Sequence, residues 1–148
     1  MQVLVGGIDE AGRGPVIGPM VMAIAVTNDM NKLRAMGVRD SKELNPAGRS
    51  RLFSILKSVL IYMDYEVIEP KAIDNYVYMN ALNILEVEIA TKLINRASSR
   101  ISLKVVYIDS PDPRPERFRD MIKRNIVGSV EVIAMNNADK LVPVVSAA

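Results

Sequence analysis

The chain contains neither cysteine nor histidine among its 148 residues. The absence of cysteine excludes a disulfide framework, a thiol nucleophile and a thiolate metal site. The absence of histidine excludes a Ser-His-Asp triad, a histidine general base and a histidine-ligated zinc or copper site. Any catalysis must therefore use carboxylates, lysine, serine, tyrosine or backbone groups. Any bound metal must be held by oxygen, which favours magnesium, manganese or calcium.

The sequence also lacks a long hydrophobic run and a targeting signal. The longest apolar stretch, residues 16–26, contains Gly18 and Pro19 and is too short to cross a bilayer. The N-terminus reaches Asp9 and Glu10 before any basic side chain, which is not the pattern of a signal peptide. We therefore expect a cytoplasmic protein with no membrane partner.

No strong excess of one charge is present, because 19 basic residues face 17 acidic ones. A net charge of +2 is compatible with nucleic-acid binding but does not argue for it. The length, with 49% hydrophobic and 24% charged residues, is typical of one globular domain, expected here over residues 1–148. No internal repeat, linker or low-complexity segment divides it.

The apolar pattern predicts an α/β fold with a mixed sheet flanked by helices. Strands are expected over residues 3–8, 20–27, 61–68 and 103–108, with a short fifth strand over 130–134, and helices over 46–60, 80–97 and after Pro115. The first two strands form a plausible antiparallel pair. The final residues, 143–148, are small and apolar, so we expect the sequence to end inside an element.

Two adjacent carboxylates, Asp9 and Glu10, directly follow the first apolar strand. Burying such charges is costly unless they are paired or bind a cation. Neighbouring residues of a regular strand face opposite sides, so both can serve one site only if the backbone turns at Glu10. Gly12 and Gly14 would allow that turn. The alternative is a turn at the strand end that carries two solvated acids.

Asp109 repeats this pattern at the end of another apolar strand. If the two strands are parallel neighbours, Asp9, Glu10 and Asp109 converge beyond their carboxyl ends, where sites of α/β sheets collect. Three carboxylates there could hold one or two Mg²⁺ ions, which would activate water and stabilise the leaving oxygen of phosphoryl transfer. The alternative is that Asp109 caps the turn that follows it.

Three other features are weak when each is taken alone. The turn Gly12-Arg13-Gly14 exposes backbone groups and an arginine that can donate to phosphate, but most such turns are only turns. Lys42 offers a cation before a helix, although a solvated loop is the simpler interpretation. A cluster of basic residues is most simply a solvated helix face: Arg114, Arg117, Arg119, Lys123 and Arg124.

Several segments, taken together, carry a family resemblance. They are residues 7–20 (GIDEAGRGPVIGPM), Asp40-Ser41-Lys42, Asn80 with Asn83, residues 106–109 (VYID), 115–118 (PERF), 138–140 (ADK) and 143–148 (PVVSAA). The chain resembles the type 2 ribonucleases H, ribonuclease HII, in their archaeal form. The first segment is long and highly specific, the others occur in the family's order, and the resemblance covers the whole chain.

The resemblance implies a ribonuclease H-like fold with a mixed five-stranded sheet flanked by helices. It also implies a metal-dependent endonuclease, using Mg²⁺ or Mn²⁺, that hydrolyses the RNA strand of RNA/DNA hybrids. The same family incises ribonucleotide-containing duplex DNA and leaves 3′-hydroxyl and 5′-phosphate ends. No obligate protein partner is expected.

Individual residues match the family's functional positions. Asp9, Glu10 and Asp109 match three of its metal-binding, catalytic carboxylates. The loop Gly12-Arg13-Gly14 matches the one that reads the ribose 2′-hydroxyl, and Lys42 matches a lysine near the substrate backbone. A histidine-free carboxylate site suits metal-dependent phosphodiester hydrolysis.

The resemblance departs from the family at the C-terminal end. The resemblance implies that the family pattern continues past Ala148 into helices with a fourth carboxylate and a tyrosine that packs against the junction nucleotide. We therefore expect an incomplete catalytic set and a weakly active or inactive chain. The alternative function is a nucleic-acid-binding module that retains the 2′-hydroxyl loop but does not cut. A phosphoryl-transfer enzyme acting on small molecules is poorly supported, because no P-loop is present.

Overall fold

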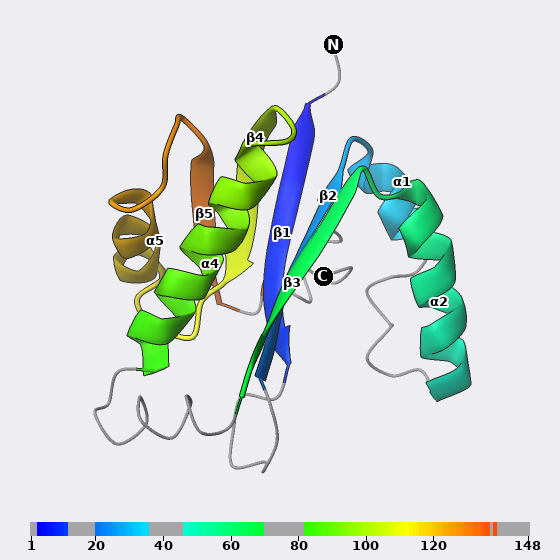
Figure 1. The fold of residues 1–148 in the computed structure, drawn as a ribbon, viewed down its shortest axis with the longest axis horizontal. Coiled ribbons are helices and arrows are strands. Elements are labelled where there is room, and N and C mark those ends of the chain that lie inside the picture. The colour runs from blue at the N-terminus through cyan, green and yellow to red at the C-terminus, as the bar shows by residue number, and fades with distance from the viewer. Residues whose placement is uncertain (1–2, 12–19, 36–45, 70–81, 137, 139–148) are drawn as a thin grey trace.

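The computed structural model describes residues 3–11, 20–35, 46–69, 82–136 and 138 (Figure 1). Its elements are β1 (Leu4–Ala11), β2 (Met20–Thr27), α1 (Met30–Ala35), α2 (Pro46–Val59), β3 (Tyr62–Ile68), α4 (Leu82–Ser98), β4 (Leu103–Asp109), α5 (Pro115–Lys123) and β5 (Glu131–Met135). No helix among these residues is long and apolar enough to span a membrane.

The strands form one five-stranded sheet in the order β3-β2-β1-β4-β5. β1 is antiparallel to β2 and β2 is antiparallel to β3, whereas β4 is parallel to both β1 and β5. The parallel partners are joined through helices, since a parallel connection must cross back along the sheet. The predicted mixed sheet is confirmed, and so is the antiparallel pairing of its first two strands.

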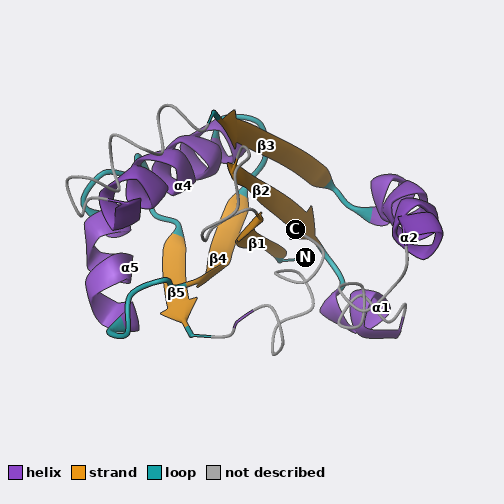
Figure 2. Ribbon diagram, turned by 90° about the horizontal axis from the view of Figure 1, so that it is seen from below, coloured by secondary structure: helices purple, strands orange, loops and turns teal. Residues whose placement is uncertain are grey.

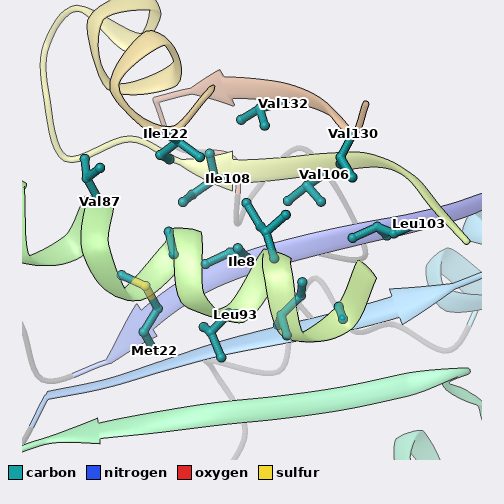
Figure 3. Packing of buried hydrophobic residues seen from close by; sticks show 14 of the residues in the cluster. Ile8, Met22, Val87, Leu93, Leu103, Val106, Ile108, Ile122, Val130 and Val132 are labelled. Carbon is teal, nitrogen blue, oxygen red and sulfur yellow. The ribbon is translucent and has the colours of Figure 1, made fainter. Parts of the chain in front are cut away.

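The larger core lies where α4 and α5 pack on one face of the sheet (Figure 3). Ala90, Leu93 and Ala97 of α4 recur at helical spacing and are fully buried. They face sheet residues such as Ile8 and Val106, which are also fully buried. Burying a large aliphatic side chain contributes about 1.5–3 kcal/mol, so this layer supplies much of the fold's stability.

A smaller core covers the opposite face of the sheet, where α1 and α2 lie (Figure 2). Leu33 of α1 and Leu56 of α2 pack there with Ala25 of β2. The sequence interpretation missed α1, which is too short to show a clear apolar period. Its start was nevertheless signalled by Asp29, whose Oδ1 accepts the backbone N–H of Lys32 at 3.1 Å, as an N-cap does.

Gly6 allows β1 to pack tightly in the middle of the sheet. A Cβ at this position would lie 3.3 Å from side-chain atoms of both Leu103 and Val106, and 3.6 Å from Ile24. These contacts are closer than most side chains tolerate in a dense core. The glycine therefore allows β1 to pack closely against its neighbouring strands in this core.

The edge strand β3 is tied to α4 by charged side chains. Arg96 of α4 donates through Nε to Asp64 at 2.7 Å and through Nη1 to Glu66, and Lys92 lies 3.6 Å from Glu66. The hydroxyl of Tyr62 donates to Asp64 at 3.3 Å, and partial burial together with this carboxylate raises the pKa of Tyr62. This network anchors an edge strand whose other face is exposed at Tyr65 and Val67.

The packing of α4 predicts that truncating a buried residue of this helix lowers protein stability much more than truncating an exposed one. Leu93→Ala should lower the free energy of unfolding by about 2–5 kcal/mol, because the leucine is fully buried against the sheet. The matched control Ile84→Ala removes a side chain of the same helix that is 46% exposed, and should cost less than about 1 kcal/mol. Urea denaturation followed by circular dichroism measures both. Equal losses would contradict the packing described above.

Candidate functional site

Three carboxylates meet at one edge of the sheet. β1 and β4 are parallel neighbours, so their carboxyl ends lie at the same edge. Asp9 and Glu10 lie near the end of β1, and Asp109 is the last residue of β4. One carboxylate oxygen from each lies within 4.8 Å of the others. The structure thus brings together the three residues that the sequence placed at one site.

The strand alternation places Asp9 and Asp109 on the same face of the sheet. Ile8 packs in the larger core beneath α4, so the next residue, Asp9, points to the face of α1 and α2. Tyr107 packs on that second face, and Asp109, two residues further on, shares its side. Glu10 is two residues after Ile8, so its side chain leaves β1 on the same face as Ile8, the face covered by α4. Asp9 and Glu10 therefore leave β1 on opposite faces.

The expectation of a backbone turn at Glu10 is wrong. β1 continues in register with β2 through the pair Ala11–Val21, so Glu10 is still part of the strand. The pairing of β1 with β4 extends only as far as Ile8–Ile108. The Oδ1 atom of Asp9 accepts the N–H of Glu10 at 2.9 Å, which restricts the orientation of the aspartate. The longer glutamate can reach the same edge from the other face.

Asp109 is oriented by the segment that follows β5. Its Oδ1 accepts the backbone N–H of Ala138 at 3.0 Å, and Ala138 is fully buried in the smaller core. The turn after Asp109 is closed by Ser110, whose Oγ donates to the carbonyl of Asp112 and accepts its N–H. The neighbour of Asp109 therefore supplies hydrogen bonds that stabilise this turn.

The turn after β4 has a second brace that sequence reasoning missed. The side-chain amide of Asn136 donates to the carbonyls of Ser110 at 3.2 Å and Asp112 at 3.0 Å. Ser110 precedes a proline, a common turn signal, and could have been recognised. Nothing local to Asn136 indicates its role, because its partners lie 24 and 26 residues away in the sequence.

The cluster has the donor chemistry of a hard-cation site. Asp9 is only 8% exposed, and such burial of a charge beside two others is costly without a counter-charge. Oxygens on opposite sides of a Mg²⁺ ion lie about 4.2 Å apart, so oxygens within 4.8 Å fit one ion after a small rotation of the side chains. Carboxylates without nitrogen or sulfur ligands also suit Mn²⁺.

The other predicted site residues lie outside the described residues. They are Gly12, Arg13 and Gly14 of the proposed 2′-hydroxyl loop, and Lys42. Their roles stay predictions. Gly12 follows the described end of β1 by one residue, so the loop starts in sequence directly after the carboxylate pair.

The comparisons with known proteins decide the family. The family model described as Ribonuclease HII matches residues 6–148. The chain belongs to the ribonuclease HII family. Ribonuclease HII of Caldivirga maquilingensis is 47% identical over 145 residues, covering 98% of this chain and 66% of that protein.

Solved structures agree with this assignment and with the fold. The ribonuclease H2 of Pyrococcus horikoshii OT3 superposes with a TM-score of 0.88 at 41% identity, covering 99% of this chain and 68% of that one. Ribonuclease HII of Archaeoglobus fulgidus, solved in a complex with PCNA, gives 0.87 at 32% identity, covering 99% and 69%. The predicted ribonuclease H-like fold is confirmed. The chain spans about two thirds of the length of the ribonuclease HII proteins that it matches.

A cation held by the three carboxylates would stabilise the folded protein. Adding Mg²⁺ or Mn²⁺ should raise the free energy of unfolding of the wild type, by about 2.7 kcal/mol at 100 times the dissociation constant, because the ion binds the folded state. Glu10→Gln removes one of the three ligands and should reduce this gain, whereas the control Glu131→Gln changes an exposed acid at the start of β5 and should keep it. Denaturant titration with the metal and in EDTA measures the difference. An equal gain in Glu10→Gln and the wild type would contradict a shared cation site.

Proposed function

We propose that this protein is a metal-dependent endonuclease that hydrolyses the RNA strand of RNA/DNA hybrids. The observation that carries the proposal is the convergence of Asp9, Glu10 and Asp109 in a chain without histidine or cysteine. Membership of the ribonuclease HII family supplies the substrate class. The ribonuclease H2 and ribonuclease HII names of the relatives support the same reaction.

The three carboxylates would hold Mg²⁺ or Mn²⁺. When bound, such ions activate water and stabilise the leaving oxygen of phosphodiester hydrolysis. The chain's own contribution is to hold the ligands in place before the ion arrives. The N–H of Glu10 orients Asp9, and the N–H of Ala138 orients Asp109. Fixed ligands reduce the reorganisation that would otherwise accompany the reaction.

Incision at single ribonucleotides embedded in duplex DNA is the finer part of the proposal. At one position, only the 2′-hydroxyl distinguishes a ribonucleotide from a deoxyribonucleotide. The loop Gly12-Arg13-Gly14, which the family resemblance assigns to that contact, follows the carboxylate pair directly in the sequence. The expected products carry 3′-hydroxyl and 5′-phosphate ends.

A second candidate function is binding of the hybrid without cleavage. It would follow if the three carboxylates that converge among the described residues hold a cation but do not suffice for hydrolysis. The chain also offers Asp139, outside the described residues, directly after the residue whose N–H contacts Asp109. The variant Asp139→Asn tests whether a further carboxylate within these 148 residues contributes to activity.

Cleavage is expected to require Mg²⁺ or Mn²⁺ and the carboxylate cluster. A labelled RNA/DNA hybrid should be cut in the presence of either ion and remain intact in EDTA. Asp9→Asn and Asp109→Asn should each lower the rate by on the order of 10²-fold or more, because misplaced ligands misalign the reaction. Gel electrophoresis of the products measures the rates. The control Asp120→Asn changes a 53% exposed carboxylate of α5 and should leave the rate unchanged.

Cleavage that persists in excess EDTA would rule out the metal-dependent mechanism. Binding of the hybrid by the wild type without cleavage in either ion would favour the second candidate function. Equal rates for the wild type and Asp109→Asn would show that Asp109 is not needed for the reaction and would contradict the proposed role of the cluster.

Gly14→Val should impair recognition of the ribonucleotide while leaving the fold intact. A side chain at this glycine would intrude where the backbone is proposed to approach the 2′-hydroxyl. Cleavage of a duplex with a single ribonucleotide measures the effect, and circular dichroism checks the fold. Unchanged cleavage by the variant would refute the role assigned to the loop.

A further inference from the structure

Among the described residues, the segments that follow strand ends at the carboxylate edge carry exposed acids, whereas the proposed substrate is itself a polyanion. Glu69 directly follows β3, and Glu116 lies in the first turn of α5, after β4. Cations bound at the central cluster would not neutralise these flanking acids. Between Asp109 and the first turn of α5, the basic side chains are those of Arg114 and Arg117.

Arg114 is held in a turn whose shape is fixed by several hydrogen bonds. Its backbone N–H donates to Oδ1 of Asp112 at 2.9 Å, and the hydroxyl of Ser110 closes the turn. The amide of Asn136 bridges two carbonyls of the same turn from the end of β5. The turn starts directly after Asp109, so its position is fixed relative to the carboxylate cluster.

Arg117 lies in the first turn of α5 and remains accessible. Its side chain is 66% exposed, and its Nε is 3.8 Å from Oδ2 of Asp112. An exposed ion pair this long contributes little to stability and leaves most of the guanidinium donors open to solvent. Arginine presents several N–H groups in a planar fork that matches the oxygens of a phosphate.

We propose that Arg114 and Arg117 contact backbone phosphates of the bound nucleic acid beside the scissile position. Arg114 follows Asp109 by five residues, so their Cα atoms lie at most about 18 Å apart. With a rise of about 3.4 Å per nucleotide, that Cα–Cα span corresponds to about five nucleotides. This inference rests on the proposed function, because it assumes a nucleic-acid substrate at the carboxylate edge.

The opposite end of α5 supplies a matched control. Lys123 and Arg124 are exposed basic residues at the C-terminal end of the same helix. A nine-residue helix is about 13 Å long, and α5 connects the carboxyl end of β4 to the start of the parallel strand β5. These residues therefore lie toward the edge remote from the carboxylates. They carry the same positive charge as Arg114 and Arg117, but far from the carboxylate cluster.

The experiment compares two double variants of the 148-residue chain in binding to a labelled RNA/DNA hybrid. Fluorescence anisotropy in EDTA keeps the substrate intact, and several salt concentrations are used. Arg114→Ala with Arg117→Ala should weaken binding and reduce the slope of log affinity against log salt by about 1–2, since each lost phosphate contact removes about one counterion release. Lys123→Ala with Arg124→Ala should leave the slope unchanged.

A further pair of variants separates charge from turn structure. Arg114→Lys with Arg117→Lys should retain the wild-type salt slope, because both positive charges remain. In Mg²⁺ or Mn²⁺, the double alanine variant should raise KM and retain most of kcat, as expected for residues that bind substrate rather than act on the reacting atoms. Thermal melting checks that each variant folds.

Two failures can be distinguished. If the wild type neither binds nor cleaves the hybrid, the proposed function fails. If the wild type binds and the double alanine variant at Arg114 and Arg117 shows the same salt slope, the inference fails and the proposed function stands. An equal loss in the variants at Lys123 and Arg124 would also overturn it, because the binding would then follow total charge rather than position.

Discussion

The parallel pairing of β1 with β4 is the constraint on which the site depends. These strands are far apart in the sequence, yet their continuous register from Val5–Val105 to Ile8–Ile108 places their carboxyl ends side by side. Because that register ends one residue before Asp9, the edge of β1 beyond it is not paired with β4. The open edge lets Asp9 and Glu10, which start from opposite faces, bring their carboxylates to the end of β4. A shift of one residue would reverse the faces and separate the ligands.

The packing around these strands also holds the carboxylates in place. Ile8 is fully buried beneath α4, and Gly6 allows close contact with Leu103 and Val106. Hydrogen bonds from the backbone of Glu10 and Ala138 then fix two of the three acids. Hydrogen bonds to ligand side chains are typical of sites that orient their ligands for a cation.

The sequence predicted the main strands and helices well because their apolar periods are clear. The long stripe of α4 and the apolar run of β4 required no tertiary information. The short helix α1 was missed, since one buried leucine and a cap at Asp29 give little pattern.

The convergence of the three acids was predicted, but through a wrong local geometry at Glu10. Which edge of a strand lies open depends on where its partner ends, and that is not encoded in the neighbouring residues. The hydrogen bonds of Asn136 could not be predicted either, because their partners are distant in the sequence.

The arrangement of charge around the site follows from two opposing requirements. A dense group of carboxylates favours hard cations, but its field would repel the proposed polyanionic substrate within about 10 Å at ordinary salt. Asp112 already has partners, because its Oδ1 accepts the N–H of Arg114 and its Oδ2 lies 3.8 Å from Nε of Arg117. Arginines in this turn and in the first turn of α5 would offset the repulsion locally, without adding a cation that competes for the central carboxylates. The turn that carries Arg114 starts directly after Asp109 and is braced by the end of β5, so Asp109 and Arg114 belong to one braced segment.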